Sequence, residues 1–274
     1  MDPVDQAPTR AARRRERVEE VVPPLDFPLV LVRLLTTLAL AGLAVLAVHA
    51  GSLVMMGWLV WTAAGLAWGW PSIAGLDVGW RVSAVTLLTG VLAAGAVALV
   101  DDQPVLRLVP IALAVGIVVT FLLQLVRSDG RQGLTTEVAA TASALGLIGV
   151  GSGLLAVSRV PVGPGVMPVV MGAVAAASLV DLAASRLPDR AWLVPMAMVV
   201  GGAAGLGAAT ALGSFTWGVG LLLGMFVGAL SLAVRSVIEA QPGGRTVPAQ
   251  VSAACASVLS VGALAHVAEL VLAR

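Results

Sequence analysis

The sequence predicts an all-helical integral membrane protein with many spans. Of its 274 residues, 59% are hydrophobic and only 11% are charged, and the mean hydropathy is +1.00. A soluble domain carries about 25% charged residues. The apolar residues also form blocks of about twenty, the length that crosses a hydrocarbon core about 30 Å thick at about 1.5 Å per residue. These observations predict a polytopic helical bundle.

Nine apolar blocks predict about nine transmembrane helices. The expected spans are residues 29–50, 53–72, 82–100, 105–126, 136–157, 166–186, 191–212, 215–235 and 249–272. Residues 1–28 precede them, rich in Arg and Glu and without an apolar period, so we expect a disordered cytoplasmic tail. The remainder, residues 29–274, is then a single membrane domain without a soluble domain.

The arginines predict the orientation of the bundle. With the N-terminus inside, twelve arginines fall on the cytoplasmic side and three on the outside, and Arg33 lies within the first span. This asymmetry favours an inside N-terminus and an outside C-terminus. All 16 basic residues are Arg, a bias typical of GC-rich coding sequences, so we expect a bacterial cytoplasmic (inner) membrane protein.

Tryptophans lie near the expected span ends. The inner-boundary residues are Trp68, Trp70, Trp80 and Trp192, and Trp217 lies near an outer boundary. Tryptophan is enriched at membrane–water interfaces. We therefore interpret these side chains as an aromatic belt.

Glycines repeat at helical spacing in two consecutive spans. They are Gly201 and Gly205 in one span and Gly220, Gly224 and Gly228 in the next. Small residues four apart lie on one helix face and let a second helix approach closely. The short connection between the two spans therefore predicts a tightly packed helical hairpin.

Recognisable catalytic and metal-binding motifs are missing from the sequence. There is no Lys for a phosphate loop, no HExxH motif, no Ser-His-Asp arrangement and only one cysteine, Cys255. His266 and Glu269 share a helix face, and we expect a hydrogen-bonded pair because a metal would need more ligands. We predict no catalytic residue, metal or cofactor. Nothing in the sequence predicts nucleic-acid binding.

One carboxylate inside an apolar span is the strongest candidate for function. Asp181 lies shortly before the cytoplasmic end of its span, and an acidic side chain at that depth is costly. In one interpretation, Asp181 pairs with a nearby arginine. In the other, it belongs to a lipid-headgroup pocket, because guanidinium groups suit phosphate. The candidate residues of that pocket are Asp181, Arg186, Arg190, Arg127, Arg131, Arg235 and Arg245.

Four stretches resemble the phosphatidate cytidylyltransferases, which are also called CDP-diacylglycerol synthases. They are AGLAWGWPSIAGL, VTFLLQLVRSDGRQGLTTEVAATA, SLVDLAASR and SLAVRSVIEAQPGG. The resemblance places Asp181 at the family's active-site aspartate. The chain departs from the family at Leu232, which stands where a metal-binding aspartate is expected, and at Gly69, which stands where a glutamate is expected.

These departures favour a pseudoenzyme over an active transferase, because nucleotidyl transfer needs Mg²⁺ held by carboxylates. The first hypothesis is therefore a non-catalytic membrane protein that binds an anionic lipid headgroup or a partner in the membrane. A small-solute permease is the alternative, and an active cytidylyltransferase-like enzyme is the second alternative. The sequence does not determine the oligomeric state.

Overall fold

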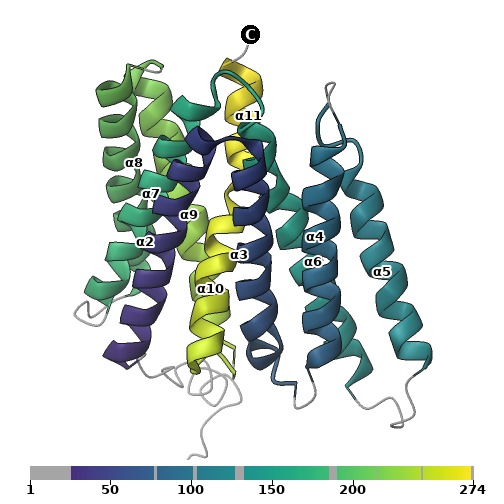
Figure 1. The fold of residues 1–274 in the computed structure, drawn as a ribbon. Helices are drawn as coiled ribbons and strands as arrows, with labels where there is room; N and C mark the ends of the chain where they lie inside the picture. The colour runs from purple at the N-terminus through teal and green to yellow at the C-terminus, as the bar shows by residue number, and fades with distance from the viewer. Residues whose placement is uncertain are drawn as a thin grey trace, which may run out of the picture.

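A computed structural model shows a bundle of helices, as Figure 1 illustrates. It describes residues 26–76, 79–100, 104–126, 133–184, 190–213, 215–241 and 243–272. The α-helices are α2 (Phe27–Ala50), α3 (Ser52–Ile73), α4 (Trp80–Ala98), α5 (Val109–Leu125), α6 (Leu134–Val157), α7 (Gly163–Ala184), α8 (Leu193–Leu212), α9 (Trp217–Glu239), α10 (Val247–Ser260) and α11 (Gly262–Leu272), and a 3₁₀ turn covers Arg190–Trp192. The expected tail lies almost entirely outside the described residues.

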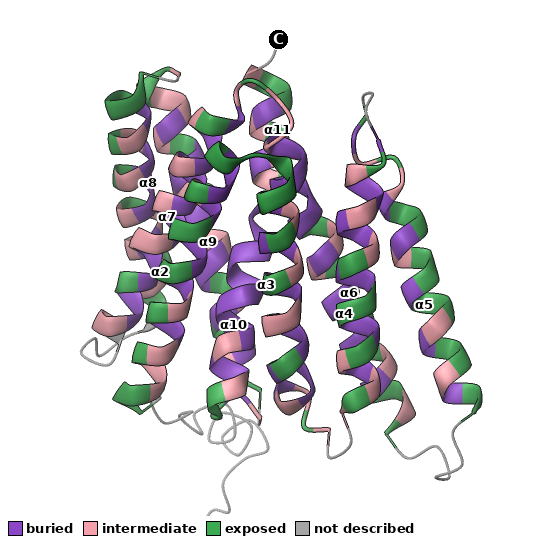
Figure 2. Ribbon diagram, viewed as in Figure 1, coloured by how far each residue is buried: buried purple, intermediate pink, exposed green. Residues whose placement is uncertain are grey.

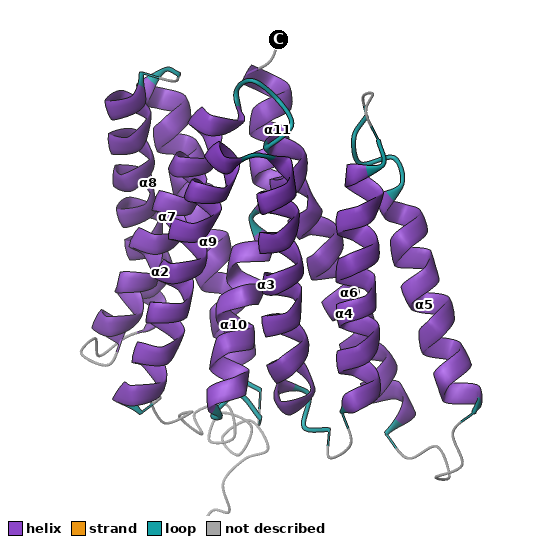
Figure 3. Cartoon of the chain, viewed as in Figure 1, coloured by secondary structure: helices purple, strands orange, loops and turns teal. Residues whose placement is uncertain are grey.

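Most of these helices have the length and composition of membrane spans. Among the described residues, eight helical segments are long and apolar enough to cross a membrane, with α10 and α11 counted together as residues 247–272. No strand occurs in the part of the chain that the structure describes (Figure 3). The predicted fold class, a polytopic helical bundle, is therefore confirmed, and the chain is a multi-pass membrane protein.

Two of the expected spans are not single long helices of the predicted length. Helix α5 has 17 residues and begins at Val109, four residues later than expected, because residues 105–108 form a turn before it. The last span is interrupted at Val261, where a turn separates α10 from α11. Both are still apolar segments that run between the two ends of the bundle (Figure 1).

The helices run up and down, so their ends gather in two layers. The start of α2 and the end of α9 lie at one end of the bundle, and the C-terminus lies at the other (Figure 1). We call the end that holds the start of α2 the arginine-rich end, since Arg33, Arg81, Arg235 and Arg245 all belong to segments near it.

Apolar residues occupy both the inside and the outside of the bundle. Fully buried positions such as Met55, Leu66 and Met171 form the core, and Figure 2 shows buried residues facing inward and exposed ones outward. The outward side chains are also apolar, for example Phe121 and Phe226, which are more than half exposed. An exposed apolar surface around the whole bundle suits a hydrocarbon solvent rather than water.

The tryptophans divide into two groups, and this corrects one expectation. Trp68, Trp80, Trp192 and Trp217 are all exposed, as an interfacial belt requires. Trp70 is buried instead, and its indole Nε1 donates a hydrogen bond to the Ala140 carbonyl at 2.7 Å. Because a buried indole N–H needs an acceptor, Trp70 joins α3 to α6 and does not belong to the belt.

Helices α8 and α9 form the closest hairpin of the bundle. A Cβ added to Gly201 would lie 2.5 Å from the Gly224 carbonyl oxygen, and one added to Gly205 would lie 2.9 Å from the Gly224 Cα. Gly220 and Gly228 are in equally tight positions against α8. The glycine residues therefore permit backbone-to-backbone contact, and a larger side chain at these positions has no space.

Candidate functional site

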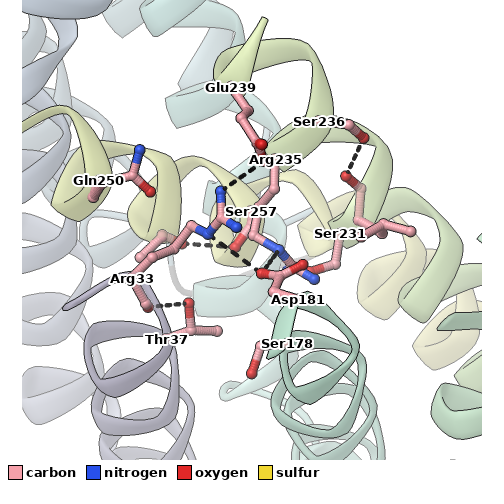
Figure 4. A network of polar contacts seen from close by, with 12 residues as sticks. Arg33, Thr37, Ser178, Asp181, Ser231, Arg235, Ser236, Glu239, Gln250 and Ser257 are labelled. Atoms are coloured by element: carbon pink, nitrogen blue, oxygen red, sulfur yellow. Dashed lines mark hydrogen bonds and ion pairs between the residues drawn. The ribbon is translucent and has the colours of Figure 1, made fainter. Parts of the chain in front are cut away.

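A buried ionic network joins three helices near the arginine-rich end (Figure 4). The Asp181 Oδ2 atom of α7 lies 3.0 Å from Arg235 Nε of α9 and 3.3 Å from Arg33 Nε of α2. Arg33 Nη1 also lies 3.4 Å from Glu239 Oε2, at the end of α9. We call these four residues the ionic network.

The members of the ionic network are shielded from solvent to different degrees. The side chains of Arg235, Arg33 and Asp181 are 1%, 3% and 5% exposed, whereas that of Glu239 is 17% exposed. Arg235 also donates from Nη1 to Ser231 Oγ at 2.6 Å and from Nη2 to the Ala177 carbonyl at 3.2 Å. Glu239 is thus the member nearest to the surface.

The formal charges of the ionic network cancel. Two guanidinium groups face two carboxylates, and Asp181 contacts both arginines. Removing one partner from such a buried pair costs about 3–5 kcal/mol, because it leaves a charge without compensation. The arrangement therefore locks α2, α7 and α9 together, and Arg235 is engaged with protein groups rather than open to an external phosphate.

The structure brings together only part of the predicted headgroup pocket. Asp181 and Arg235 are in contact, and Arg245 is exposed in the connection between α9 and α10. The side chains of Arg127, Arg131, Arg186 and Arg190 lie outside the described residues.

Sequence reasoning missed two members of the ionic network, Arg33 and Glu239. The signal was present, because an arginine within an apolar span is costly and normally has a partner. That partner could not be named, since Asp181 and Glu239 come from distant segments of the chain.

A second feature is a groove between α6 and α9, which we call the α6/α9 groove. It consists of two adjoining cavities of about 520 and 530 Å³. Both are lined by Trp70, Ser143, Val237 and Ile238. Trp70 from α3 and Ser260 from α10 contribute to the groove between the two flanking helices. Each volume lies within the range of about 300–1,000 Å³ that is usual for small-molecule sites.

The α6/α9 groove has one polar end. Thr135, Thr136 and Gln241 line the cavity at the arginine-rich end, where α6 begins and α9 has just ended. Farther along, the lining is mainly aliphatic and includes Leu147, Val150 and Leu230. The groove is therefore amphipathic along its length, which is the pattern of a lipid: a polar headgroup followed by hydrocarbon.

The ionic network and the α6/α9 groove lie on different faces of α9. Arg235 and Ser231 are four residues apart and face α7, whereas Val234 and Val237 face the groove. Residues on a helix repeat every 3.6 positions, so Val237, two residues after Arg235, points in nearly the opposite direction. One face of α9 thus contacts α2 and α7 through the ionic network, and the opposite face forms a wall of the groove.

Other buried polar groups serve helix packing. Arg81 Nη1 lies 3.9 Å from Glu137 Oε1, which joins α4 to α6. At the opposite end, His266 Nδ1 and Glu269 Oε2 are 2.8 Å apart, the hydrogen-bonded pair expected from their spacing. No group of three or more metal-ligating side chains occurs among the described residues.

The environment of Leu232 bears on the resemblance to the cytidylyltransferases. Leu232 is 4% exposed and packs with Ala177, Val180 and Ala197. An apolar cluster therefore occupies the position at which the resemblance implies a metal-binding carboxylate. The neighbouring Asp181 is paired with arginines.

The fold defines a multi-pass helical membrane protein with a buried ionic network and an amphipathic lateral groove. No protein-family model, curated protein or solved structure matches the chain.

Proposed function

We propose that this chain is a non-catalytic lipid-binding protein of the bacterial inner membrane, with an anionic phospholipid in the α6/α9 groove. The groove is the observation that carries the proposal. It lies between the apolar helices α6 and α9, and its lining is polar at the arginine-rich end, with Thr135, Thr136 and Gln241, and mainly aliphatic beyond it. Threonine hydroxyls and a glutamine amide can donate hydrogen bonds to phosphate or ester oxygens.

The distribution of charge supports an anionic headgroup on the cytoplasmic side. Arginine predominates at the end of the bundle where the groove has its polar residues. The exposed Arg245 follows Gly244, whose backbone N–H donates to the Gln241 carbonyl at 3.1 Å. Basic residues at a membrane surface attract anionic lipids by about 1 kcal/mol each.

Two observations favour binding over catalysis. Asp181, which the resemblance assigns to the active site, has both neighbouring arginines as partners at 3.0 and 3.3 Å. Leu232 and its neighbours form an apolar cluster beside it. Phosphoryl transfer depends on metal ions and cationic groups directed at the transferred phosphate. In this chain, Asp181 contacts arginines and Leu232 packs in an apolar cluster instead.

The direct experiment is mass spectrometry of lipids retained after gentle purification. We expect phosphatidylglycerol or another anionic phospholipid at a near-stoichiometric ratio, and lower retention in Arg245→Ala. Purified protein given CTP, Mg²⁺ and phosphatidic acid should form no CDP-diacylglycerol. A protein without retained anionic lipid would contradict the binding proposal, and Mg²⁺-dependent product formation that Asp181→Asn abolishes would restore the enzyme.

The break in the last span favours a permease as the second candidate. Discontinuous helices contribute to many transporter sites, and Ser260, the last residue of α10, lines the α6/α9 groove. Its hydroxyl, however, donates to the Ser257 carbonyl at 2.9 Å. Flux of a small solute into proteoliposomes, without specific lipid retention, would favour the permease.

A further inference from the structure

We infer that the α6/α9 groove selects lipids by the length of one acyl chain, which lies along α6 beyond the polar end of the groove and ends near Val150. This inference rests on the proposed lipid-binding function and specifies the ligand. The chemical class is an anionic phospholipid with one saturated chain of about palmitoyl length in the groove. Its headgroup lies near Thr135 and Gln241.

The length of the groove follows from helix geometry. Thr135 and Val150 are lining residues fifteen positions apart on α6, which corresponds to about 22 Å along the helix axis. One leaflet contributes only about 15 Å of hydrocarbon. With its headgroup region, one leaflet is about 20–22 Å thick. A lipid whose headgroup lies at Thr135 therefore fills the groove only if its chain is extended to about the bilayer midplane, and a shorter chain such as lauroyl leaves the deep end unfilled.

Small side chains leave open space along the groove. Gly146 of α6 and Ala233 of α9 line it, and a Cβ added to Gly146 would meet nothing within 4 Å. At its deep end the groove is lined by larger aliphatic side chains, Val150 and Leu230. Open space beside Gly146 and an aliphatic lining beyond it suit an unbranched chain.

The two serines of the groove do not make its wall strongly polar. The Ser143 hydroxyl donates to the Ala139 carbonyl at 2.8 Å, and the Ser260 hydroxyl donates to the Ser257 carbonyl at 2.9 Å. Because both hydroxyl hydrogens are directed at backbone oxygens, they are not available to a ligand. An acyl chain can therefore lie against this part of the groove without leaving a buried hydroxyl donor unsatisfied.

The selectivity must come from packing rather than from the hydrophobic effect. A chain that leaves the bilayer for the groove exchanges one apolar surrounding for another. What it gains is contact with a fixed surface, and a short chain leaves part of that surface poorly packed. We therefore expect moderate discrimination, about threefold to tenfold in retained lipid between palmitoyl and lauroyl forms.

Blocking the groove at Gly146 tests this inference. Gly146 is eleven residues beyond Thr135, or about 16 Å along α6, so Gly146→Leu fills the deep part and leaves the polar end intact. Ala233→Leu blocks the groove from α9. Gly207→Leu in α8 is the matched control, because Gly207 is exposed and also has nothing within 4 Å of an added Cβ.

The readout is native mass spectrometry of protein equilibrated with equal amounts of dilauroyl and dipalmitoyl phosphatidylglycerol. We expect the wild type and Gly207→Leu to retain the palmitoyl lipid about threefold or more over the lauroyl lipid. Gly146→Leu and Ala233→Leu should lose or reverse this preference and still bind the lauroyl form. Equal binding of both lipids by the wild type, or a preference unchanged in both groove variants, would overturn the inference while lipid binding itself stands. Failure of the wild type to retain either lipid would contradict the proposed function as well.

Discussion

Replacing Gly224 by alanine should destabilise the α8–α9 hairpin, although alanine is the better helix former. The added Cβ would lie 3.0 Å from the Gly201 carbonyl carbon and 3.1 Å from the Gly202 Cα, and it would overlap the Gly201 carbonyl oxygen. All three atoms belong to the backbone, so no side-chain rotation relieves the contact. Helix α8 must move away by about 1 Å, a gap that forfeits a quarter to a half of each van der Waals contact.

The size of the effect can be estimated from two opposing contributions. Overpacking of this kind costs about 1–3 kcal/mol, and replacing glycine by alanine within a helix returns up to about 1 kcal/mol. With several glycine contacts along the same seam, we expect a net loss of about 2 kcal/mol. For a chain of this size, that loss lowers the apparent Tm by about 4–8 °C.

Gly207→Ala supplies the control with the opposite expected sign. Gly207 lies within the same helix pair, in α8, but an added Cβ would have nothing within 4 Å. It should therefore leave the apparent Tm unchanged or raise it slightly, through helix propensity alone. Thermal unfolding of both variants in the same detergent measures the difference. Equal shifts for Gly224→Ala and Gly207→Ala would refute the argument for a glycine seam.

Two further predictions concern the ionic network and the orientation of the chain. Asp181→Asn should lower the free energy of unfolding by about 3–5 kcal/mol, because both arginine partners lose their shared counter-charge. Glu239→Gln should cost less, since Glu239 is more exposed than Asp181 and lies 3.4 Å from Arg33. Denaturation in detergent compares the two variants, and equal losses would contradict this ranking. A single cysteine in place of the exposed Arg245, introduced with Cys255→Ser, should be unreactive to a membrane-impermeant thiol reagent in intact cells and should react in opened membranes. Labelling in intact cells would contradict the predicted orientation.

Local and repetitive features of the fold could be predicted from the sequence. The length and apolarity of each block specify a membrane span, because a bilayer leaves a helix as the main way to satisfy backbone hydrogen bonds. The glycine spacing in residues 201–228 likewise specifies a face that admits close approach, and α8 and α9 do meet there. Both depend on short-range periodicity, which a sequence displays directly.

The start of α5 and the interruption at Val261 were harder to predict, because the hydropathy of a segment does not show where another helix contacts it. The sequence around Val261 contains no proline, and the small residues Ser260 and Gly262 beside it are of types that also occur within the unbroken spans of this chain. They do not by themselves indicate a turn. In the structure, the carbonyl oxygen of the adjacent Gly262 lies against Gly153 of α6. The break coincides with this close contact between helices, which has no counterpart in the hydropathy of the segment itself.

The two candidate sites were decided by tertiary structure. The composition of α7 identified Asp181 as a costly charge, but only packing of α2, α7 and α9 brings Arg33 and Arg235 within 3.3 and 3.0 Å of it. The α6/α9 groove depends on which helices are neighbours and how closely they approach, and an apolar stripe looks the same whether it meets lipid or another helix. The sequence by itself thus determined that the helices lie in a membrane, where the spans are and which glycines form a close-packing face. The pairing of charges and the shape of the groove arose from long-range packing.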